Sequence, residues 1–345
     1  MRDYNISECS HGELTSIIEA NFASPDPYLF ALARKQSLKF YGGRVFIRGL
    51  VEVSNYCRRG CLYCGINRDN TELTRYRLTP EQILECFAQG HGLGLRSFVM
   101  QGGEDPGFPD EVMTDIIREF RRRFADSALT LSLGEKSADT YRAFHEAGAD
   151  RYLLRHETAT KTHYDCLHPA DMDFDERVRC LYTLKDAGFQ TGAGFMVGSP
   201  FQTINDLARD LLFLKELDPH MVGLGPFIAQ KDTPFADYPS GGAALSLVML
   251  ALTRLMLPKA MLPATTALAT VLGGDRKPMF DAGANVVMPN ISPPETRGLY
   301  ALYNGKLSAG AESAEGLAAL AAQIREAGYT PDFSRGDHVT EARKH

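Results

Sequence analysis

The sequence predicts an α/β fold, namely a (β/α)8 TIM-type barrel with an N-terminal helical extension and a short C-terminal tail. Apolar runs of strand length alternate with amphipathic stretches of helix length. The alternation repeats eight times, as a closed parallel barrel requires, because parallel strands need a crossover helix between them. The length of 345 residues also falls within the range of such a barrel with extensions.

The segment before the barrel, from Ser10 through Leu38, is predicted to be helical. The candidate barrel strands follow in order: Val45–Val53, Ser97–Gln101, Leu129–Leu133, Arg151–Arg155, Thr191–Val197, Met221–Leu224, Met261–Thr265 and Asn285–Met288.

Residues typical of helix ends separate these strands. Thr79, followed by proline and by Gln82, predicts a capped helix start with a capping box. Two further starts have the same pattern, Asp173 with Glu176 and Thr203 with Asp206. Helices are expected to end at Gly148 and Gly188, where a left-handed residue stops a helix at little steric cost.

We expect one domain over residues 1–345, because no linker of low complexity divides the chain. Helices occupy 1–40, the barrel 41–306, and a helix at Ala314–Ala327 with a tail the remainder, 307–345. The tail near Arg335–His345 is polar and is expected to be mobile.

Composition limits the function classes. The net charge of −6 disfavours a surface for nucleic acid or anionic membrane, so small molecules or proteins are the expected partners. The first residues contain no apolar core of signal-peptide length, and no run of about 18 apolar residues occurs. With seven cysteines, an odd number, the chain fits a reducing compartment, and we expect a cytoplasmic protein.

The most informative motif is the cysteine triplet of Cys57, Cys61 and Cys64, spaced C-x3-C-x2-C directly after the first strand. Three thiolates are one short of a closed tetrahedral site, so the spacing indicates an iron–sulfur cluster with one open iron. An open iron is able to hold a substrate or cofactor. A structural zinc site completed by a distant histidine, or buried thiols without a role, remain the alternatives.

Other polar residues end the predicted strands, where barrel enzymes place their sites. Gln101 precedes Gly102, Gly103 and Glu104, a turn that allows close approach to a ligand. Strand alternation places Thr130 and Ser132 on one side, and it points Arg151, Arg155 and Glu157 into the barrel. These charges should pair with a charged ligand or with one another as an internal network. Further candidates are Thr265, Thr266, Tyr300 and Tyr303, the two tyrosines being equally suited to helix packing.

Together the triplet, the aromatic Tyr63 before its third thiol, the Gly-Gly-Glu turn and the eight βα units resemble the radical S-adenosylmethionine (SAM) superfamily. Within it, the chain is similar to the HydE family of [FeFe]-hydrogenase maturases from about residue 40 to about 306. The segments that support this narrower resemblance are 55–70, 148–159, 191–198, 221–228, 262–267 and 283–290.

The resemblance implies a [4Fe–4S] cluster on Cys57, Cys61 and Cys64 that chelates S-adenosyl-L-methionine and cleaves it reductively to a 5′-deoxyadenosyl radical. The implied cofactor contacts are Gly102, Gly103 and Glu104 for the methionyl amine, Arg177 for its carboxylate, Glu157 and Ser132 for the ribose side, and Ile228. The implied substrate contacts, lining an anion-tolerant cavity, are Gln101, Thr130, Arg151, Thr265, Thr266 and Tyr300.

The same resemblance implies a substrate and partners. The substrate would be an iron–carbonyl–cyanide–cysteine complex on its way to the diiron subcluster, and the partners would be other hydrogenase maturation proteins and an external one-electron donor. A methylornithine synthase-like mutase is the nearest alternative, and biotin-synthase-like sulfur insertion comes third. A non-catalytic iron–sulfur carrier or scaffold is the alternative from another class, although a carrier needs neither the Arg151, Arg155 and Glu157 layer nor the glycine turn.

Overall fold

The computed structural model describes residues 5–22, 24–307, 310 and 313–340. A short 3-10 helix and two α-helices precede the barrel: η1 (Ile6–Glu8), α1 (His11–Phe22) and α2 (Pro27–Tyr41). The helical extension expected from Ser10 through Leu38 is thus present, interrupted before Pro27, where Asp26 caps α2 by accepting from the Tyr28 N–H.

The strands are short. Their bounds are β1 (Arg44–Ile47), β2 (Gly49–Ser54), β3 (Ser97–Gly102), β4 (Ala128–Ser132), β5 (Arg151–Leu153), β6 (Gln190–Ala193), β7 (Met196–Val197), β8 (Met221–Val222), β9 (Gly225–Pro226), β10 (Val286–Val287) and β11 (Thr330–Asp332).

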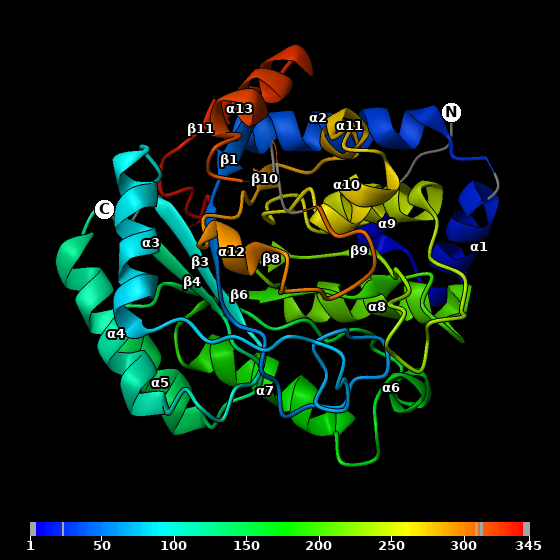
Figure 1. The fold of residues 1–345 in the computed structure, drawn as a ribbon. Coiled ribbons are helices and arrows are strands. Elements are labelled where there is room, and N and C mark those ends of the chain that lie inside the picture. The colour runs from blue at the N-terminus through cyan, green and yellow to red at the C-terminus, as the bar shows by residue number, and fades with distance from the viewer. Residues whose placement is uncertain (1–4, 23, 308–309, 311–312, 341–345) are drawn as a thin grey trace.

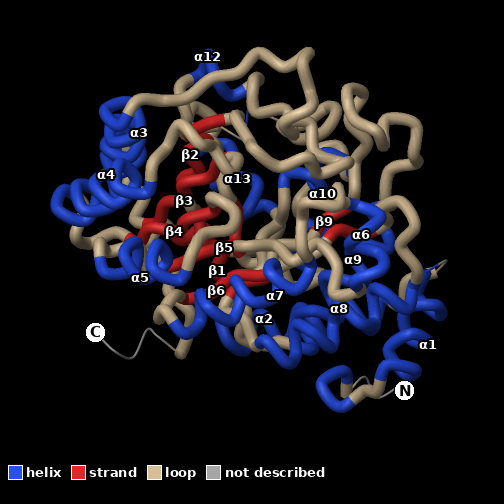
Figure 2. Tube along the Cα trace, turned by 90° about the horizontal axis from the view of Figure 1, so that it is seen from below, coloured by secondary structure: helices blue, strands red, loops and turns tan. Residues whose placement is uncertain are grey.

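Helices follow these strands around the outside of the sheet (Figures 1 and 2). Their bounds are α3 (Pro80–Gly92), α4 (Asp110–Arg123), α5 (Ala138–Glu146), α6 (Lys161–Leu167), α7 (Phe174–Asp186), α8 (Ile204–Leu217), α9 (Ala243–Met256), α10 (Thr266–Val271), α11 (Lys277–Asp281), α12 (Pro294–Arg297) and α13 (Leu317–Glu326).

The strands form a parallel ring. Six of them pair in the order β2-β3-β4-β5-β6-β8, and β1, which precedes β2 across Arg48, pairs with β10. Single bridges close the ring, from Met221 to Met261 and from Pro263 to Val286. The predicted parallel barrel is therefore confirmed, and Figure 2 shows the strands in the middle with helices around them.

The helix-end predictions are confirmed except for the capping box of Asp173 with Glu176, in which Asp173 caps the helix alone. Thr79 and Thr203 each close a capping box, with Gln82 and Asp206 respectively. Asp173 caps α7 by accepting from the Asp175 N–H. Gly148 and Gly188 follow α5 and α7 with positive φ angles of 114° and 92°.

The expected strand at Met261–Thr265 is wrong. This segment makes only isolated bridges, at Met261 and Pro263. Pro263 has no N–H for a ladder, and Thr265 turns out of the segment to cap α10, where its side chain accepts from the Leu268 N–H.

The expectation of a mobile tail also needs correction. Strand β11 adds to β1 in parallel, with Arg44 opposite Thr330. Beyond it, Arg335 donates to Asp150 at 2.9 Å and to the Ser127 carbonyl at 2.6 Å. The tail therefore closes the amino-terminal end of the barrel, while residues 341–345 lie outside the described part of the chain.

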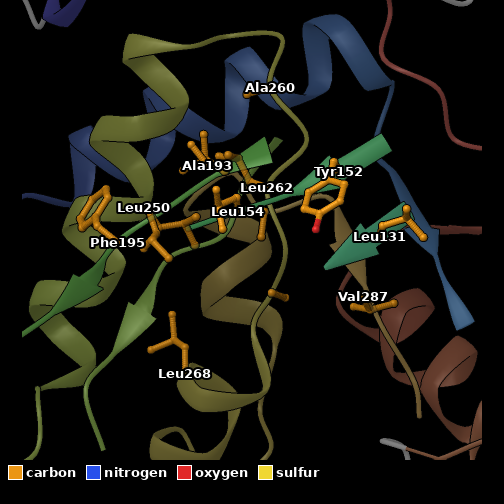
Figure 3. Close-up of a cluster of buried hydrophobic side chains, with 14 of the residues drawn as sticks. Leu131, Tyr152, Leu154, Ala193, Phe195, Leu250, Ala260, Leu262, Leu268 and Val287 are labelled. Atoms are coloured by element: carbon orange, nitrogen blue, oxygen red, sulfur yellow. The ribbon is translucent and has the colours of Figure 1, made fainter. Parts of the chain in front are cut away.

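The apolar core lies between the strands and the helices. Outward strand residues such as Leu131, Tyr152 and Ala193 belong to the same buried apolar cluster as helix residues such as Leu250 (Figure 3). Inward positions carry polar groups instead, including Glu52 and Thr130, both buried. A polar barrel interior is suited to binding a ligand, whereas a barrel that is only packed has an apolar interior. No helix in the described ranges is long and apolar enough to cross a bilayer.

Candidate functional site

The cysteine triplet lies in the long segment between β2 and α3, at the carboxyl-terminal end of the barrel. One side chain organises this segment. The Arg75 guanidinium donates to the carbonyls of Asn55, Ile66, Asn67 and Asn70 at 2.6 to 3.0 Å. A single rigid fork thus holds both flanks of the cysteine loop, a role that its sequence position did not reveal.

Two glycines allow the loop to approach its neighbours. A Cβ at Gly103 would lie 2.1 Å from the Tyr56 carbonyl oxygen and 2.7 Å from Cys57 Cβ. A Cβ at Gly65 would lie 2.0 Å from the Ala301 carbonyl oxygen. These are backbone contacts that cannot yield, so the turn after β3 must be glycine to lie against the first cysteine.

The three thiols are free and half-buried. Burial raises the pKa of Cys61 to about 12, and the charge of Arg177 and a hydrogen bond from Tyr63 act against that rise. Burial likewise raises the pKa of Cys57 and of Cys64. The thiols are therefore protonated until a metal displaces their protons, which ties metal uptake to proton release.

The donor set fits a cluster. Within the described residues, no three Cys, His, Asp or Glu side chains meet at one point able to hold a single metal ion. In a cubane each thiolate binds its own iron, so the thiols need not converge on one point. Three soft thiols on one tightly held loop suit that arrangement.

The predicted contacts for the ends of SAM meet in one charged network. Glu104 accepts from Arg58 at 3.0 Å and Arg59 at 2.6 Å. Arg59 continues to Glu135 at 2.6 Å, and Glu135 accepts from Arg177 at 2.5 Å. Although burial acts in the opposite direction, Glu135 keeps the pKa of Arg177 well above its ordinary value. Arg59 and Glu135, which join the two predicted contacts, were missed because they lie on separate loops.

Glu157 adopts an unusual backbone conformation. Its φ of 66° is left-handed, which costs a side chain with a Cβ about 1–2 kcal/mol. The surrounding backbone maintains it, because the Glu157 N–H donates to Gly194 O at 3.0 Å and its carbonyl accepts from Met196. Strain retained in this way is typical of ligand sites.

The side chain of Glu157 forms an ion pair with Arg155 at 3.0 Å. Its two atoms, Arg155 Nη2 and Glu157 Oε2, are buried and have only each other as partners, while Arg155 Nε is buried without a hydrogen-bond partner. The buried hydroxyl of Thr130 also lacks one. Buried polar groups are almost always paired, so these orphaned atoms mark the place where a bound ligand or water completes the structure.

The remaining predicted contacts form one group around Gln101 and another around Thr265. Gln101 and Ser132 are neighbours in the β3–β4 register, and Gln101 Nε2 donates to the Tyr300 hydroxyl at 3.4 Å. Thr265 donates to Leu224 O at 3.1 Å, Thr266 begins α10, and Ile228 lies half-buried after β9. Gln101 and Ser132 lie at the ends of β3 and β4, and Ile228 follows β9, so these residues lie toward the carboxyl-terminal end.

Arg151 lies elsewhere, contrary to the expected cavity shared with Thr265 and Thr266. It begins β5. Across the barrel, Leu153 lies beside Gly192, Gly192 beside Met221, and Met221 beside Met261. Arg151 comes before this level on its strand and Thr265 comes after it, so the two lie toward opposite ends of the barrel. It is fully buried and bonds Asp337 at 2.6 Å, the Arg335 carbonyl at 2.8 Å and Ser97 at 3.0 Å. Arg151 therefore belongs to an internal ion-pair network, the second of the two predicted possibilities, because its carboxylate partner, Asp337, comes from the tail.

Sequence reasoning also missed a buried group inside the barrel. Glu52 ion-pairs with Lys306 and accepts from Asn290 at 2.7 Å. Lys306 lies over the Tyr300 ring, 4.8 Å from its centroid. Burial raises the pKa of Glu52 despite these partners. The inward position of Glu52 on β2 was the available signal.

Comparison with known proteins agrees with this geometry. Residues 51–214 match the Radical SAM superfamily. The [FeFe] hydrogenase maturase subunit HydE of Thermotoga maritima is 50% identical over 279 residues, which cover 81% of this chain and 79% of the relative. The 3-methylornithine synthase of Methanosarcina acetivorans is 26% identical over 84% of this chain and 81% of its own length.

Two solved structures share the fold. Methylornithine synthase (PylB) superposes with a TM-score of 0.82 at 24% identity, covering 99% of this chain and 98% of the other. The maturase HydG from Carboxydothermus hydrogenoformans gives 0.77 at 20% identity, covering 94% and 76%. At these identities the likeness concerns the fold alone.

Proposed function

The chain belongs to the HydE family of radical SAM enzymes, and from this premise we propose that it acts on an iron–carbonyl–cyanide–cysteine precursor of the diiron subcluster of [FeFe]-hydrogenase. It uses a [4Fe–4S] cluster and SAM. When bound, the cluster supplies the electron that cleaves SAM into methionine and a 5′-deoxyadenosyl radical. Cys57, Cys61 and Cys64 would hold the cluster.

The observation that best supports the substrate class is the set of orphaned polar atoms on Thr130, Arg155 and Glu157. The Arg155 guanidinium, whose Nε has no hydrogen-bond partner, suits an anionic ligand, and a hydroxyl suits a cyanide or carboxylate acceptor. Thr130 is buried and Arg155 is half-buried, so their interactions with a ligand are stronger than in water.

The protein's part is positioning and exclusion of water. Arg177 is held charged by Glu135 and is suited to a carboxylate. Glu157 and Ser132, at the ends of neighbouring barrel segments, are suited to ribose hydroxyls. Gln101 and Tyr300, already bonded to each other, would orient the substrate below them.

Partners are part of the proposal. Other hydrogenase maturation proteins would supply and receive the small-molecule substrate, and an external donor would deliver single electrons. We expect the electron donor to have an acidic surface where it meets the cysteine loop. The Arg58 and Arg68 side chains at the rim of this loop are 57% and 39% exposed and would attract such a surface.

The test is anaerobic incubation of the reconstituted enzyme with SAM, a reductant and candidate substrates, followed by mass analysis of deoxyadenosine and adenosylated products. We expect the organometallic precursor to stimulate SAM cleavage and an amino-acid substrate of the methylornithine synthase type to leave it at the uncoupled rate. Stimulation by the amino acid alone would favour the mutase, and no cleavage by a cluster-loaded protein would favour an iron–sulfur carrier.

A further inference from the structure

Two buried side chains, His156 and Asp210, connect the segment around Glu157 to α8. His156 directly precedes Glu157 in the chain, Asp210 lies on α8, and neither side chain is exposed. His156 Nε2 lies 3.3 Å from Asp210 Oδ1, and the same oxygen accepts from the Ala159 N–H at 2.5 Å. The pair therefore contacts the chain on both sides of Glu157.

The contacts of His156 assign its hydrogen. The Gly194 N–H donates to Nδ1 at 3.3 Å, so Nδ1 carries no hydrogen. Burial lowers the pKa of His156 to about 3, so the ring is neutral and its one N–H is at Nε2, the nitrogen that lies 3.3 Å from Asp210. The Phe195 and Phe213 rings lie beside the imidazole, with centroids at 5.8 and 4.8 Å. The ring is thus held in one orientation and one tautomer.

Gly194 links the imidazole to the backbone of Glu157. Its N–H donates to His156, and its carbonyl accepts from the Glu157 N–H at 3.0 Å. A Cβ at Gly194 would lie 1.9 Å from the Gly223 carbonyl oxygen, so this backbone is packed closely against its neighbour. Without the imidazole, the buried Gly194 N–H would lose its acceptor, which is costly. The hydrogen bond that maintains the left-handed Glu157 therefore depends on a residue that His156 holds.

We infer that His156 and Asp210 are positioning residues that hold Glu157 in the backbone conformation from which its carboxylate contacts SAM. The inference rests on the proposed contact of Glu157 with the ribose side of SAM. A left-handed residue with a Cβ is disfavoured, so without this support the segment would relax and the carboxylate would move. His156 and Asp210 do not touch SAM in this role, because both are fully buried between the barrel and α8.

The experiment is a titration of SAM onto the whole chain after anaerobic reconstitution of the cluster. His156→Phe keeps a ring of similar size but removes both nitrogens. We expect the affinity for SAM to fall about tenfold, the factor that corresponds to the cost of a left-handed residue, with iron and sulfide content unchanged. In a Glu157→Ala background the same substitution should cause no further loss, because the carboxylate through which His156 acts is absent. A general loss of packing would lower the affinity in both backgrounds.

Asp210 offers a matched pair of variants. Asp210→Asn keeps an oxygen that accepts from the Ala159 N–H, whereas Asp210→Leu fills similar space without an acceptor. We expect Asp210→Asn to bind SAM within about twofold of the wild type and Asp210→Leu to lose about as much as His156→Phe. Asp337→Asn is the control for lost stability. It removes a buried ion pair at the other end of the barrel and should leave the affinity for SAM unchanged.

Amide hydrogen exchange of the same reconstituted protein without SAM reports the conformation independently of binding. The N–H groups of Glu157 and Met196 form the hydrogen bonds that maintain the left-handed conformation, and they should exchange faster in His156→Phe than in the wild type. The Leu154 N–H is the internal reference, because it donates to Gly192 O at 3.0 Å in the preceding part of the ladder and should be unchanged.

The inference is overturned by wild-type affinity or unchanged hydrogen exchange in His156→Phe, by an equal loss with and without the Glu157 side chain, or by an equal loss in Asp210→Asn and Asp210→Leu. If His156→Phe fails to fold, the two Asp210 variants and their hydrogen exchange still decide it. Failure of the proposed contact would appear separately, as wild-type affinity in Glu157→Ala alone. Hydrogen exchange would then still decide whether His156 sets the conformation of Glu157.

Discussion

The two ends of the barrel treat buried charge in opposite ways. At the amino-terminal end, Arg151, Asp337, Arg335 and Asp150 form a continuous chain of ion pairs at 2.6 to 2.9 Å, closed by the tail. Arg48 Nε is the exception there, buried without a partner. Farther along the barrel, Arg155 and Glu157 form an ion pair at 3.0 Å, but Arg155 Nε has no hydrogen-bond partner, and neither has the buried hydroxyl of Thr130, which lies beside Arg151 in the β4–β5 register.

This difference separates stability from function. A buried guanidinium with a carboxylate partner costs little to keep, while a buried group without one is costly. The chain supplies partners for the buried charges at the end that binds no ligand, and it leaves buried polar atoms without hydrogen-bond partners toward the other end. Substitutions at the closed end should therefore change unfolding, and substitutions at the open end should change ligand binding.

The largest effect is expected at the cysteine loop. Cys61→Ala should abolish the cluster and with it SAM cleavage, because two thiolates cannot hold a cubane with one open iron. Iron and sulfide content after anaerobic reconstitution measures this. Cys166→Ala is the control, since Cys166 is exposed on α6 and should leave both quantities unchanged. A full cluster in Cys61→Ala would refute the assignment of the triplet.

Asp337→Asn tests the closed end. It leaves the fully buried Arg151 without its charge partner, which should lower the free energy of unfolding by about 3 kcal/mol. Urea unfolding at neutral pH measures it. Asp139→Asn, which removes an exposed ion pair with Arg142, is the control and should cost about 0.5 kcal/mol or less. Equal effects for the two variants would contradict a structural role for the tail.

The Asp337 contribution should also depend on pH. Although burial raises it, the pKa of Asp337 is lowered overall by Arg151 and Arg335. A carboxyl with a depressed folded-state pKa stabilises the fold above its unfolded pKa of about 3.9 and loses that contribution as the pH falls toward the folded value. The stability difference between wild type and Asp337→Asn should thus shrink below about pH 4. A difference that grows on acidification would contradict the sign.

Glu157→Gln tests the open end. A hydrogen bond to a charged group contributes about 1.5–3 kcal/mol, so the affinity for SAM should fall roughly tenfold or more. The cluster should remain, because its proposed ligands are the three cysteine thiols and Glu157 is not a ligand. A binding titration on the reconstituted variant measures the loss. Unchanged affinity would return Glu157 to a purely structural ion pair with Arg155.

The smallest effect on stability is expected at Thr130. Thr130→Val removes a hydroxyl that has no partner, so the free energy of unfolding should change by less than about 1 kcal/mol. Ser97→Ala is the counterpart at the closed end. It leaves Arg151 Nη1 without its acceptor at 3.0 Å and should cost about 1–3 kcal/mol. A larger loss for Thr130→Val than for Ser97→Ala would contradict the distinction between an unpaired and a paired buried group.

Local pattern was enough to predict the strands β3 and β4, the capped starts of α3 and α8, and the cysteine triplet with its glycine turn. Each of these features is encoded by residues that are close together in the sequence. Strand alternation also placed Arg151 inside the barrel. Alternation predicts which face of a strand a side chain lies on, but it does not predict which end of the barrel the side chain is near. The partner of Arg151 lies 186 residues away, and nothing local connects the two.

The same limit explains the other misses. Met261–Thr265 has strand-like apolar residues, yet Pro263 and the cap at Thr265 decide its conformation. His168 contacts Tyr63, 105 residues away in the sequence. Arg75 binds carbonyls of its own segment, and the irregular conformation of that segment is not encoded in a local pattern. The identity of the substrate was accessible only through resemblance, because no spacing of residues encodes an organometallic ligand.

The pairing of β11 with β1 has a consequence for the order in which the chain folds. Arg44 on β1 meets Asp332 on β11 across 288 residues of sequence. During synthesis, β1 therefore emerges long before its second neighbour, and one of its edges waits unpaired until residues 330–332 follow. Contacts of such long sequence separation form late and slowly, so this edge stays open to wrong pairing for longer than the edge of a strand that pairs with its immediate successor.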